Sequence, residues 1–143
     1  MGDRIAAWLA VALLLAGCGG SHDAESDACV QHINSLRAQV GLGPLSRWND
    51  AEPCAESEAK SDSETGQAHG AFGRCKESAQ NECPHWSSTS GPSGIVPGCL
   101  DMMWGEGPGG GHYDNMTRPG VAMVACGFHV TSGGAVWAVQ DFR

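Results

Sequence analysis

The chain has few basic residues and lacks the short motifs that mark several common enzyme classes. Only 8 of its 143 residues are Lys or Arg, against 16 Asp or Glu, and the formal net charge is −8 at pH 7. Because no basic stripe is present, the sequence disfavours nucleic acid and anionic membrane surfaces as partners. H-E-x-x-H, a P-loop G-K-[ST] and a nucleophile elbow are also absent, so nothing in the sequence predicts a zincin, a P-loop NTPase or an α/β-hydrolase.

A long apolar run is lacking too, since the N-terminal one extends only from Ile5 to Ala16. A membrane-spanning helix needs about 20 apolar residues. With an early Arg4 and a small-residue stop, this run predicts a secretory signal peptide over residues 1–17. Leu15-Ala16-Gly17-Cys18 resembles a bacterial lipobox, in which Cys18 receives the lipid and becomes the mature N-terminus. Ordinary secretion with cleavage elsewhere is the alternative.

The remaining chain is long enough for one domain only. Residues 18–27 are small, polar and acidic, which predicts a tether, and residues 28–143 are expected to fold. Gly19 follows the lipidated position, where an Asp would mark retention in the inner membrane. We therefore expect an exported protein that is either anchored by lipid, with the outer membrane as its destination, or secreted.

Close C-x-x-C pairs, the usual mark of a structural zinc cluster, are missing from the cysteine pattern. An even number of cysteines in a small exported chain predicts a disulfide framework. Six cysteines allow about 15 pairings. We expect Cys29 to pair with Cys54, Cys126 with either Cys75 or Cys83, and the remaining two with each other. The cysteines concerned are Cys29, Cys54, Cys75, Cys83, Cys99 and Cys126.

Hydrophobic periodicity predicts helices first and a β-hairpin last. Apolar residues at i, i+4, i+7 and i+11 from Cys29 to Val40 predict the first helix, and Gly41 is placed to end it. A second helix is expected from Asn49 or Asp50, with Pro53 in its first turn and a buried side of small residues. The other expected segments are a loop-rich region over 66–94, a third helix over 98–104, and strands over 121–130 and 135–142. This order predicts an α+β domain with helices packed on a small antiparallel sheet.

Four segments, in order, resemble the CAP superfamily, which includes cysteine-rich secretory proteins, insect venom antigens and plant pathogenesis-related 1 proteins. The resemblance covers about residues 28–143. The segments are H-I-N-S-L-R-A-Q-V-G-L-G-P-L at 32–45, A-H-G around His69 with A-Q-N at 79–81, M-W-G-E at 103–106, and G-H-Y-D-N-M at 111–116, the last followed by A-C-G at 125–127 and W-A-V-Q-D-F at 137–142.

The resemblance implies an α-β-α sandwich with a cleft lined by two histidines and two acidic residues. Matched motif by motif, the histidines are His69 and His112, and one acid is Glu106. The family's G-E-N corresponds to A-Q-N, so Gln80 occupies the position of the second acid. Glu77 and Glu82 are then the candidates to replace that acid, with Glu77 preferred.

The expected cleft has the chemistry of a divalent-metal site. Two imidazoles and one or two carboxylates suit zinc or a similar cation. The glycines between Glu106 and His112 let the chain fold back so that both side chains face one cleft. A hydrogen-bonded cluster that merely orders the loops is the structural alternative.

These expectations favour a binding module over an enzyme. We expect a lipid-anchored, extracytoplasmic CAP-like domain that engages a lipid, a glycan or a partner protein. The alternative is a metal-assisted hydrolase, peptidase-like, that uses His69, His112 and Glu106 with Glu77 as base or fourth ligand. No residue is assigned as catalytic from the sequence.

Overall fold

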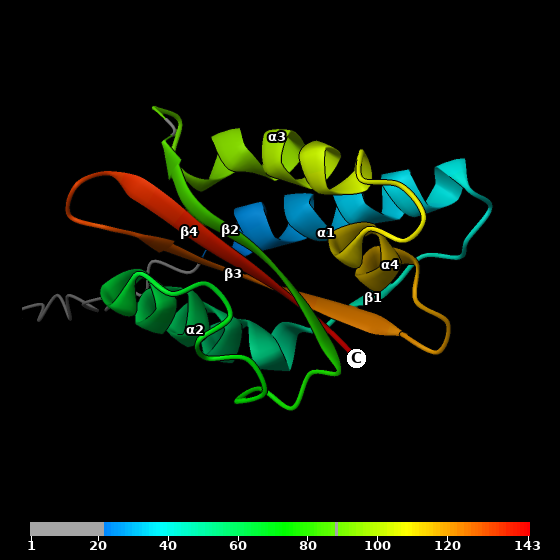
Figure 1. Cartoon of the computed structure of the whole chain (residues 1–143), viewed down its shortest axis with the longest axis horizontal. Helices are drawn as coiled ribbons and strands as arrows, with labels where there is room; N and C mark the ends of the chain where they lie inside the picture. The colour runs from blue at the N-terminus through cyan, green and yellow to red at the C-terminus, as the bar shows by residue number, and fades with distance from the viewer. Residues whose placement is uncertain (1–21, 88) are drawn as a thin grey trace, which may run out of the picture.

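The computed structural model of the protein describes residues 22–87 and 89–143 (Figure 1). The expected signal peptide and the lipidation position Cys18 lie outside these residues. The described elements are α1 (Asp23–Gln39), β1 (Ser46–Arg47), a short 3-10 helix η1 (Asn49–Ala51), α2 (Glu52–Thr65), β2 (Ala79–Ser87), α3 (Pro92–Trp104), α4 (Gly111–Thr117), β3 (Met123–Val130) and β4 (Ala135–Phe142).

The four strands form one sheet in the order β1-β3-β4-β2. The predicted hairpin is confirmed as β3 and β4, in antiparallel register with Cys126 opposite Gln140. On the other side of β4, β2 is also antiparallel and places Gln80 opposite Asp141. The short β1 pairs in parallel with β3, so the sheet is mixed, where the sequence predicted an antiparallel one.

Helices cover both faces of this sheet. Figure 1 shows α1 and α3 side by side on one face and α2 alone on the other, so the domain is an α-β-α sandwich. Alternate residues of β4 point to the two faces, as expected for a strand. Val136, Ala138 and Phe142 join the core under α1 and α3, and Trp137 and Val139 join the core under α2.

The α2 layer lies very close to the sheet, as its predicted face of small side chains implied. Ala51, Ala55 and Ala59 are buried against Trp137 and Val139. The closest approach is at Gly127 of β3, where an added Cβ would lie 2.2 Å from the backbone carbon of Ala55. Only a residue without a side chain permits this contact.

The first helix begins earlier than the sequence predicted. α1 starts at Asp23, so the last part of the expected tether, residues 23–27, is its first turn and a half. Two observations explain the extension. The Oγ of the buried Ser26 donates a hydrogen bond of 2.8 Å to the carbonyl of Cys126, and the acidic residues Asp23 and Glu25 favour a helix N-terminus.

Two further elements differ from the expectation. β2 occupies part of the segment predicted to be loop, and α3 begins at Pro92, six residues before the predicted start at Gly98. Neither change follows from hydrophobic periodicity. β2 is held by its pairing with β4, which is a tertiary interaction, and Pro92 is tolerated in the first turn of α3.

Three disulfides cross-link the domain, but their pairing differs from the expected one. They are Cys29–Cys126, Cys54–Cys75 and Cys83–Cys99. Both expected partners of Cys126, Cys75 and Cys83, are wrong, because Cys126 is bonded to Cys29. The Cys83–Cys99 bond matches the remaining pair in the version that joined Cys75 to Cys126. The predicted Cys29–Cys54 bond is wrong because α1 and α2 lie on opposite faces of the sheet.

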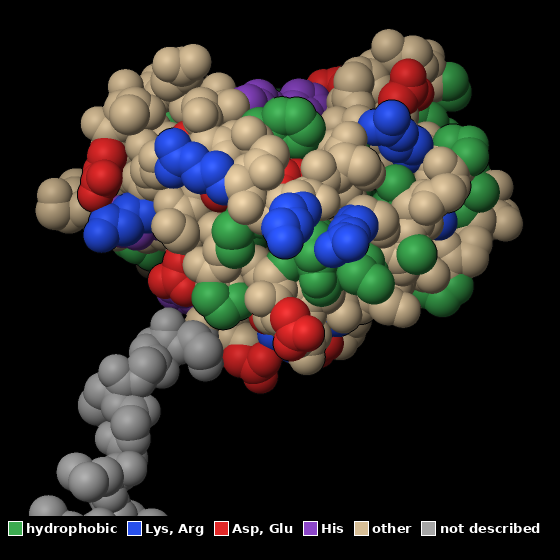
Figure 2. All heavy atoms as spheres, turned by 90° about the horizontal axis from the view of Figure 1, so that it is seen from below, with side chains coloured by type: hydrophobic (Ala, Val, Ile, Leu, Met, Phe, Trp, Pro, Cys, Tyr) green, Lys and Arg blue, Asp and Glu red, His purple; other side chains and the backbone are tan. Residues whose placement is uncertain are grey.

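Figure 2 shows the underside of the molecule as drawn in Figure 1, the side on which α2 lies. Acidic and basic side chains are interspersed there, so this face carries no patch of a single charge. None of the helices in the described part of the chain has the length and apolar character needed to cross a membrane.

Candidate functional site

Glu106 and His112 form the first half of the site. Glu106 follows the end of α3, and His112 lies in the first turn of α4. The Oε1 atom of Glu106 lies 2.6 Å from the Nδ1 atom of His112, and its Oε2 atom accepts a hydrogen bond of 3.1 Å from the backbone N–H of the same residue. The hydrogen bond from the imidazole lowers the pKa of Glu106, so this side chain is a carboxylate at neutral pH.

The glycine run between these two residues makes the contact possible. Gly107 and Gly109 have φ angles of 70° and 94°, in the left-handed region. At Gly110, an added Cβ would lie 2.4 Å from the Cβ of Glu106 and 2.8 Å from its Oε2. The predicted role of the glycines, to fold the chain back, is therefore what the structure shows.

His69 and Gln80 form the second half. The Nδ1 atom of His69 lies 2.8 Å from the Oε1 atom of Gln80, a buried residue of β2. The amide nitrogen of Gln80 donates to Glu58 at 2.8 Å and to Asp141 at 3.0 Å. Because these contacts fix the orientation of the amide, its oxygen must face the imidazole. The Nδ1 of His69 therefore carries a proton and donates it.

The two imidazoles lie next to each other. Their ring centroids are 6.5 Å apart and their planes differ by 29°. In each ring the Nδ1 atom is engaged by an oxygen of a neighbouring side chain. In its neutral form an imidazole has one donor and one acceptor nitrogen, so a ring that donates through Nδ1 has Nε2 as its acceptor. Their side chains are 43% and 34% exposed, so solutes can reach them.

Two asparagines join the halves of the site. The side-chain amide of Asn81 donates to the carbonyl of His112 at 3.1 Å. Asn115 of α4 donates in turn to the side-chain oxygen of Asn81 and to the carbonyl of Gln80, both at 3.0 Å. The position of α4, and with it that of His112, is thus tied to β2. Both residues lie within the motifs that resemble the CAP family, but local pattern does not indicate this linking role.

Glu82 supports the loop that carries His69. His69 has a φ of 59°, an uncommon value for a residue with a side chain. Its backbone N–H donates to the Oε2 of Glu82 at 2.5 Å. Glu82 itself is 2% exposed and contacts Asp62 of α2, and burial raises its pKa to about 7. Glu82 therefore holds the backbone of His69. It does not take the place of the acid that the resemblance implies at position 80, which is Gln80 in this chain.

Glu77 lies on the far side of Gln80 from His69. One of its carboxylate oxygens accepts a hydrogen bond from the backbone N–H of Gly73. Glu77 belongs to a buried group with Glu58 and Asp141, the two acids that Gln80 contacts through its amide nitrogen. The structure thus brings His69, His112, Glu106 and Gln80 together and places Glu77 in a separate cluster.

A groove of about 320 Å³ opens beside His69. Phe72, which is 50% exposed, and Arg118 contribute an aromatic ring and a cationic group to its walls. The guanidinium of Arg118 donates to the carbonyl of Ser78 at 3.1 Å and remains exposed. The groove offers apolar, polar and positively charged contacts within reach of the histidine.

Comparison with known proteins gives one family. The sequence profile described as the cysteine-rich secretory protein family, CAP, matches residues 30–142. The matched region contains every residue of the site and all the strands. No curated protein matches the chain.

Proposed function

Because the chain belongs to the CAP family of cysteine-rich secretory proteins, we propose that it is an exported binding module whose cleft holds a divalent cation, with zinc preferred, on His69 and His112. The observation that carries this proposal is the engagement of both Nδ1 atoms by side-chain oxygens. Histidines that bind a metal through Nε2 generally donate their other N–H to a carboxylate or carbonyl. Gln80 and Glu106 provide these acceptors.

The donor set fits a borderline cation. Two neutral imidazoles suit zinc better than calcium or magnesium, which prefer oxygen ligands. A bound zinc ion would supply a Lewis acid able to hold an oxygen of a ligand. The protein's own contribution is to orient both imidazoles through Gln80 and Glu106, so that the Nε2 atoms remain available as ligands.

The groove beside His69 indicates which ligands the cleft can take. Phe72 offers an exposed ring for an apolar group, and Arg118 offers a guanidinium for a carboxylate or phosphate. We infer that the ligand is an extracellular lipid, glycan or protein that presents an anionic group near Arg118. A panel of such ligands, measured with the wild-type protein and with Arg118→Ala, tests this step. Equal binding of an anionic and a neutral ligand would contradict it.

The same geometry weighs against the hydrolase alternative. At position 80 the side chain is an amide, which cannot act as a general base. The carboxylate of Glu106 is held by His112, and Glu77 lies behind Gln80. Turnover of a peptide substrate that required both a metal ion and His112 would overturn this preference.

Zinc titration by calorimetry tests the metal site directly. We expect one ion per chain, and binding at least about tenfold weaker in His69→Ala and in His112→Ala, with the fold retained by circular dichroism. His129→Ala is the matched control because His129 lies on β3, away from α4 and from the loop of His69. Unchanged zinc binding in the double variant His69→Ala/His112→Ala would refute the site.

The family and the three disulfides indicate an extracellular protein. We further propose that Cys18 carries a lipid anchor, on the basis of the lipobox-like L-A-G-C. Most of the wild-type protein should then sediment with membranes, while Cys18→Ser should be soluble. Recovery of both in the soluble fraction would favour plain secretion.

A further inference from the structure

Three acidic side chains meet inside the protein behind Gln80. Glu58 comes from α2, Glu77 from the loop before β2, and Asp141 from β4. They are 1%, 8% and 0% exposed, respectively. One oxygen of each lies within 4.8 Å of the others, a spacing that allows a single ion to contact all three. This cluster lies outside the histidine cleft that the proposed function uses.

Each of the three carboxylates has one oxygen without a partner. Gln80 donates to Glu58 Oε2 and Asp141 Oδ1, and Gly73 donates to one oxygen of Glu77. The opposite oxygens, Glu58 Oε1, Glu77 Oε2 and Asp141 Oδ2, are buried and lack a partner with good hydrogen-bond geometry, while the carboxyl groups of Glu58 and Asp141 also interact with each other. Buried acceptors of this kind are rare in folded proteins and require an explanation.

Basic side chains do not explain these unpaired acidic oxygens. Across residues 22–87 and 89–143, no Lys, Arg or His forms an ion pair with any of the three acids. A buried charge without a compensating partner is strongly unfavourable in a protein interior. Protons or a cation must therefore neutralise the cluster. Burial raises the pKa of Asp141 to about 8, so a proton is one means near neutral pH.

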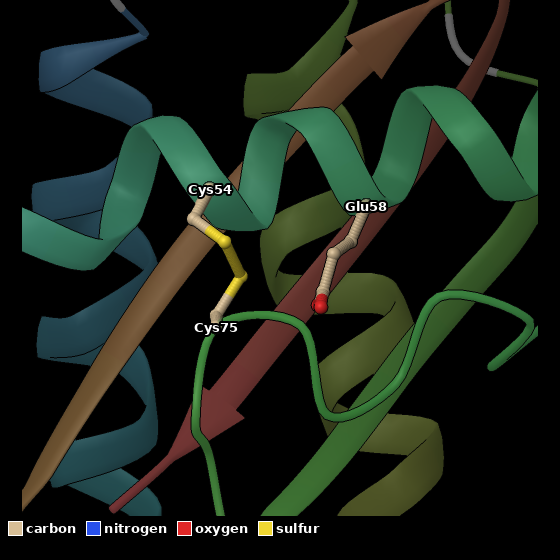
Figure 3. A group of neighbouring side chains, drawn as sticks. All are labelled: Cys54, Glu58 and Cys75. Atoms are coloured by element: carbon tan, nitrogen blue, oxygen red, sulfur yellow. A yellow bond between two sulfur atoms is a disulfide. The ribbon is translucent and has the colours of Figure 1, made fainter.

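The chemistry of the cluster selects the kind of cation. Figure 3 shows Glu58 projecting from α2 beside the Cys54–Cys75 disulfide. Because Cys75 is oxidised, its sulfur cannot act as a thiolate ligand. The available ligands are then carboxylate oxygens. Calcium and manganese prefer such oxygen ligands, whereas zinc is more often bound by nitrogen and sulfur.

We propose that Glu58, Glu77 and Asp141 bind a hard divalent cation, calcium above all, in an interior site distinct from the histidine cleft. The ion would take one oxygen from each carboxylate and join α2, β4 and the loop that precedes β2. That loop also carries His69, and the Cys54–Cys75 disulfide already fixes one point of it to α2. Bound calcium therefore stabilises the segment on which the histidine cleft depends.

The test is calcium binding to the full-length protein after removal of metals with EDTA. We expect calorimetry at pH 7.5 to show one calcium ion per chain, and thermal unfolding to move to higher temperature with saturating CaCl₂. Glu77→Gln should weaken binding at least about tenfold and remove the thermal shift. Glu64→Gln is the matched control because Glu64 lies on the same helix and its side chain is 64% exposed.

A second comparison separates this site from the proposed function. The double variant His69→Ala/His112→Ala should lose zinc binding and keep the calcium response. If calcium, manganese and magnesium all fail to bind the wild-type protein at millimolar concentration, protons alone neutralise the cluster and the proposal is wrong. It is equally wrong if Glu77→Gln responds to calcium as the wild type does. If Asp141→Asn does not fold, Glu77→Gln still tests the calcium site, because Glu77 is the most exposed of the three acids and its replacement is the best tolerated.

Discussion

The Nδ1 atom of His69 lies 2.8 Å from the Oε1 atom of Gln80, so an amide occupies the position at which the CAP resemblance implies a carboxylate. The amide has two functions at once. Its oxygen accepts from the imidazole, and its nitrogen donates to Glu58 and Asp141. A carboxylate could perform only the first.

Restoring the acid should therefore destabilise this protein. Gln80→Glu removes both donated hydrogen bonds and adds a carboxylate to a buried acidic cluster. We expect the free energy of unfolding in urea to fall by roughly 2–4 kcal/mol at pH 8. The loss should be smaller at pH 5, where protons neutralise the cluster. Glu64→Gln is the control, because the Glu64 side chain is 64% exposed and its replacement should cost little. An equally stable Gln80→Glu variant at pH 8 would show that the donated bonds contribute nothing.

The protein should be more stable in mild acid than in mild base. Burial raises the pKa of Glu82 to about 7 and that of Asp141 to about 8, above the ordinary values of 4.5 and 3.8. For an acid whose folded pKa is raised, the stabilisation is complete below the ordinary pKa and is lost as pH rises through the folded one. We expect the free energy of unfolding, without added divalent ions, to be roughly 3–5 kcal/mol lower at pH 8.5 than at pH 5.5.

Glu82→Gln provides the check on this pH dependence. Its amide oxygen can still accept the N–H of His69, but the side chain no longer titrates. The difference between the two pH values should shrink. A profile that rises from pH 5.5 to 8.5 in the wild type would contradict the expected sign.

The close approach of α2 to the sheet predicts a steric effect at Gly127. An alanine there would place its Cβ 2.2 Å from the backbone of Ala55 and Glu56. This clash can be relieved only if α2 moves away from the sheet, which should lower the free energy of unfolding by about 3 kcal/mol or more. At Gly133 the nearest atom to an added Cβ is 3.9 Å away, so Gly133→Ala should have a small effect. Similar stabilities for the two variants would refute the contact.

The disulfides should differ in their contributions. Cys29 and Cys126 are 97 residues apart, Cys54 and Cys75 are 21 apart, and Cys83 and Cys99 are 16 apart. Longer closed loops restrict the unfolded chain more, giving about 4.7 kcal/mol for a loop near 100 residues and about 3 kcal/mol for the two shorter ones. Paired Cys→Ala variants, compared by urea unfolding, should follow this order. A greater loss on removing Cys83–Cys99 than Cys29–Cys126 would contradict it.

The sequence predicted the parts of the fold and site that depend on local pattern. The hairpin, the small-residue face of α2 and the fold-back from Glu106 to His112 each rest on residues near one another in the chain. The replacement of an acid by Gln80 was also visible in the A-Q-N motif. These features required no knowledge of long-range packing.

Other features depend on which segments meet, which local pattern does not specify. Glu58 and Asp62 are four residues apart on α2, a spacing common on exposed helix faces, yet both are buried. The pairing of Cys29 with Cys126 depends on which face of the sheet each helix covers. β2 was missed because its strand conformation is stabilised by pairing with β4, which lies far along the chain: Ala79 pairs with Phe142 and Ser87 with Ala135.

The bond between Cys29 and Cys126 also determines how the domain bears mechanical load. α1 is the first described element, and this bond joins it directly to β3, in the interior of the sheet. A pull on the N-terminal end of the chain is therefore transmitted to the sheet through a covalent link. His69 and His112 both lie in the loop that this link closes, so the tension bypasses the segments that carry them. A domain held at its N-terminus can thus resist drag without distorting its cleft.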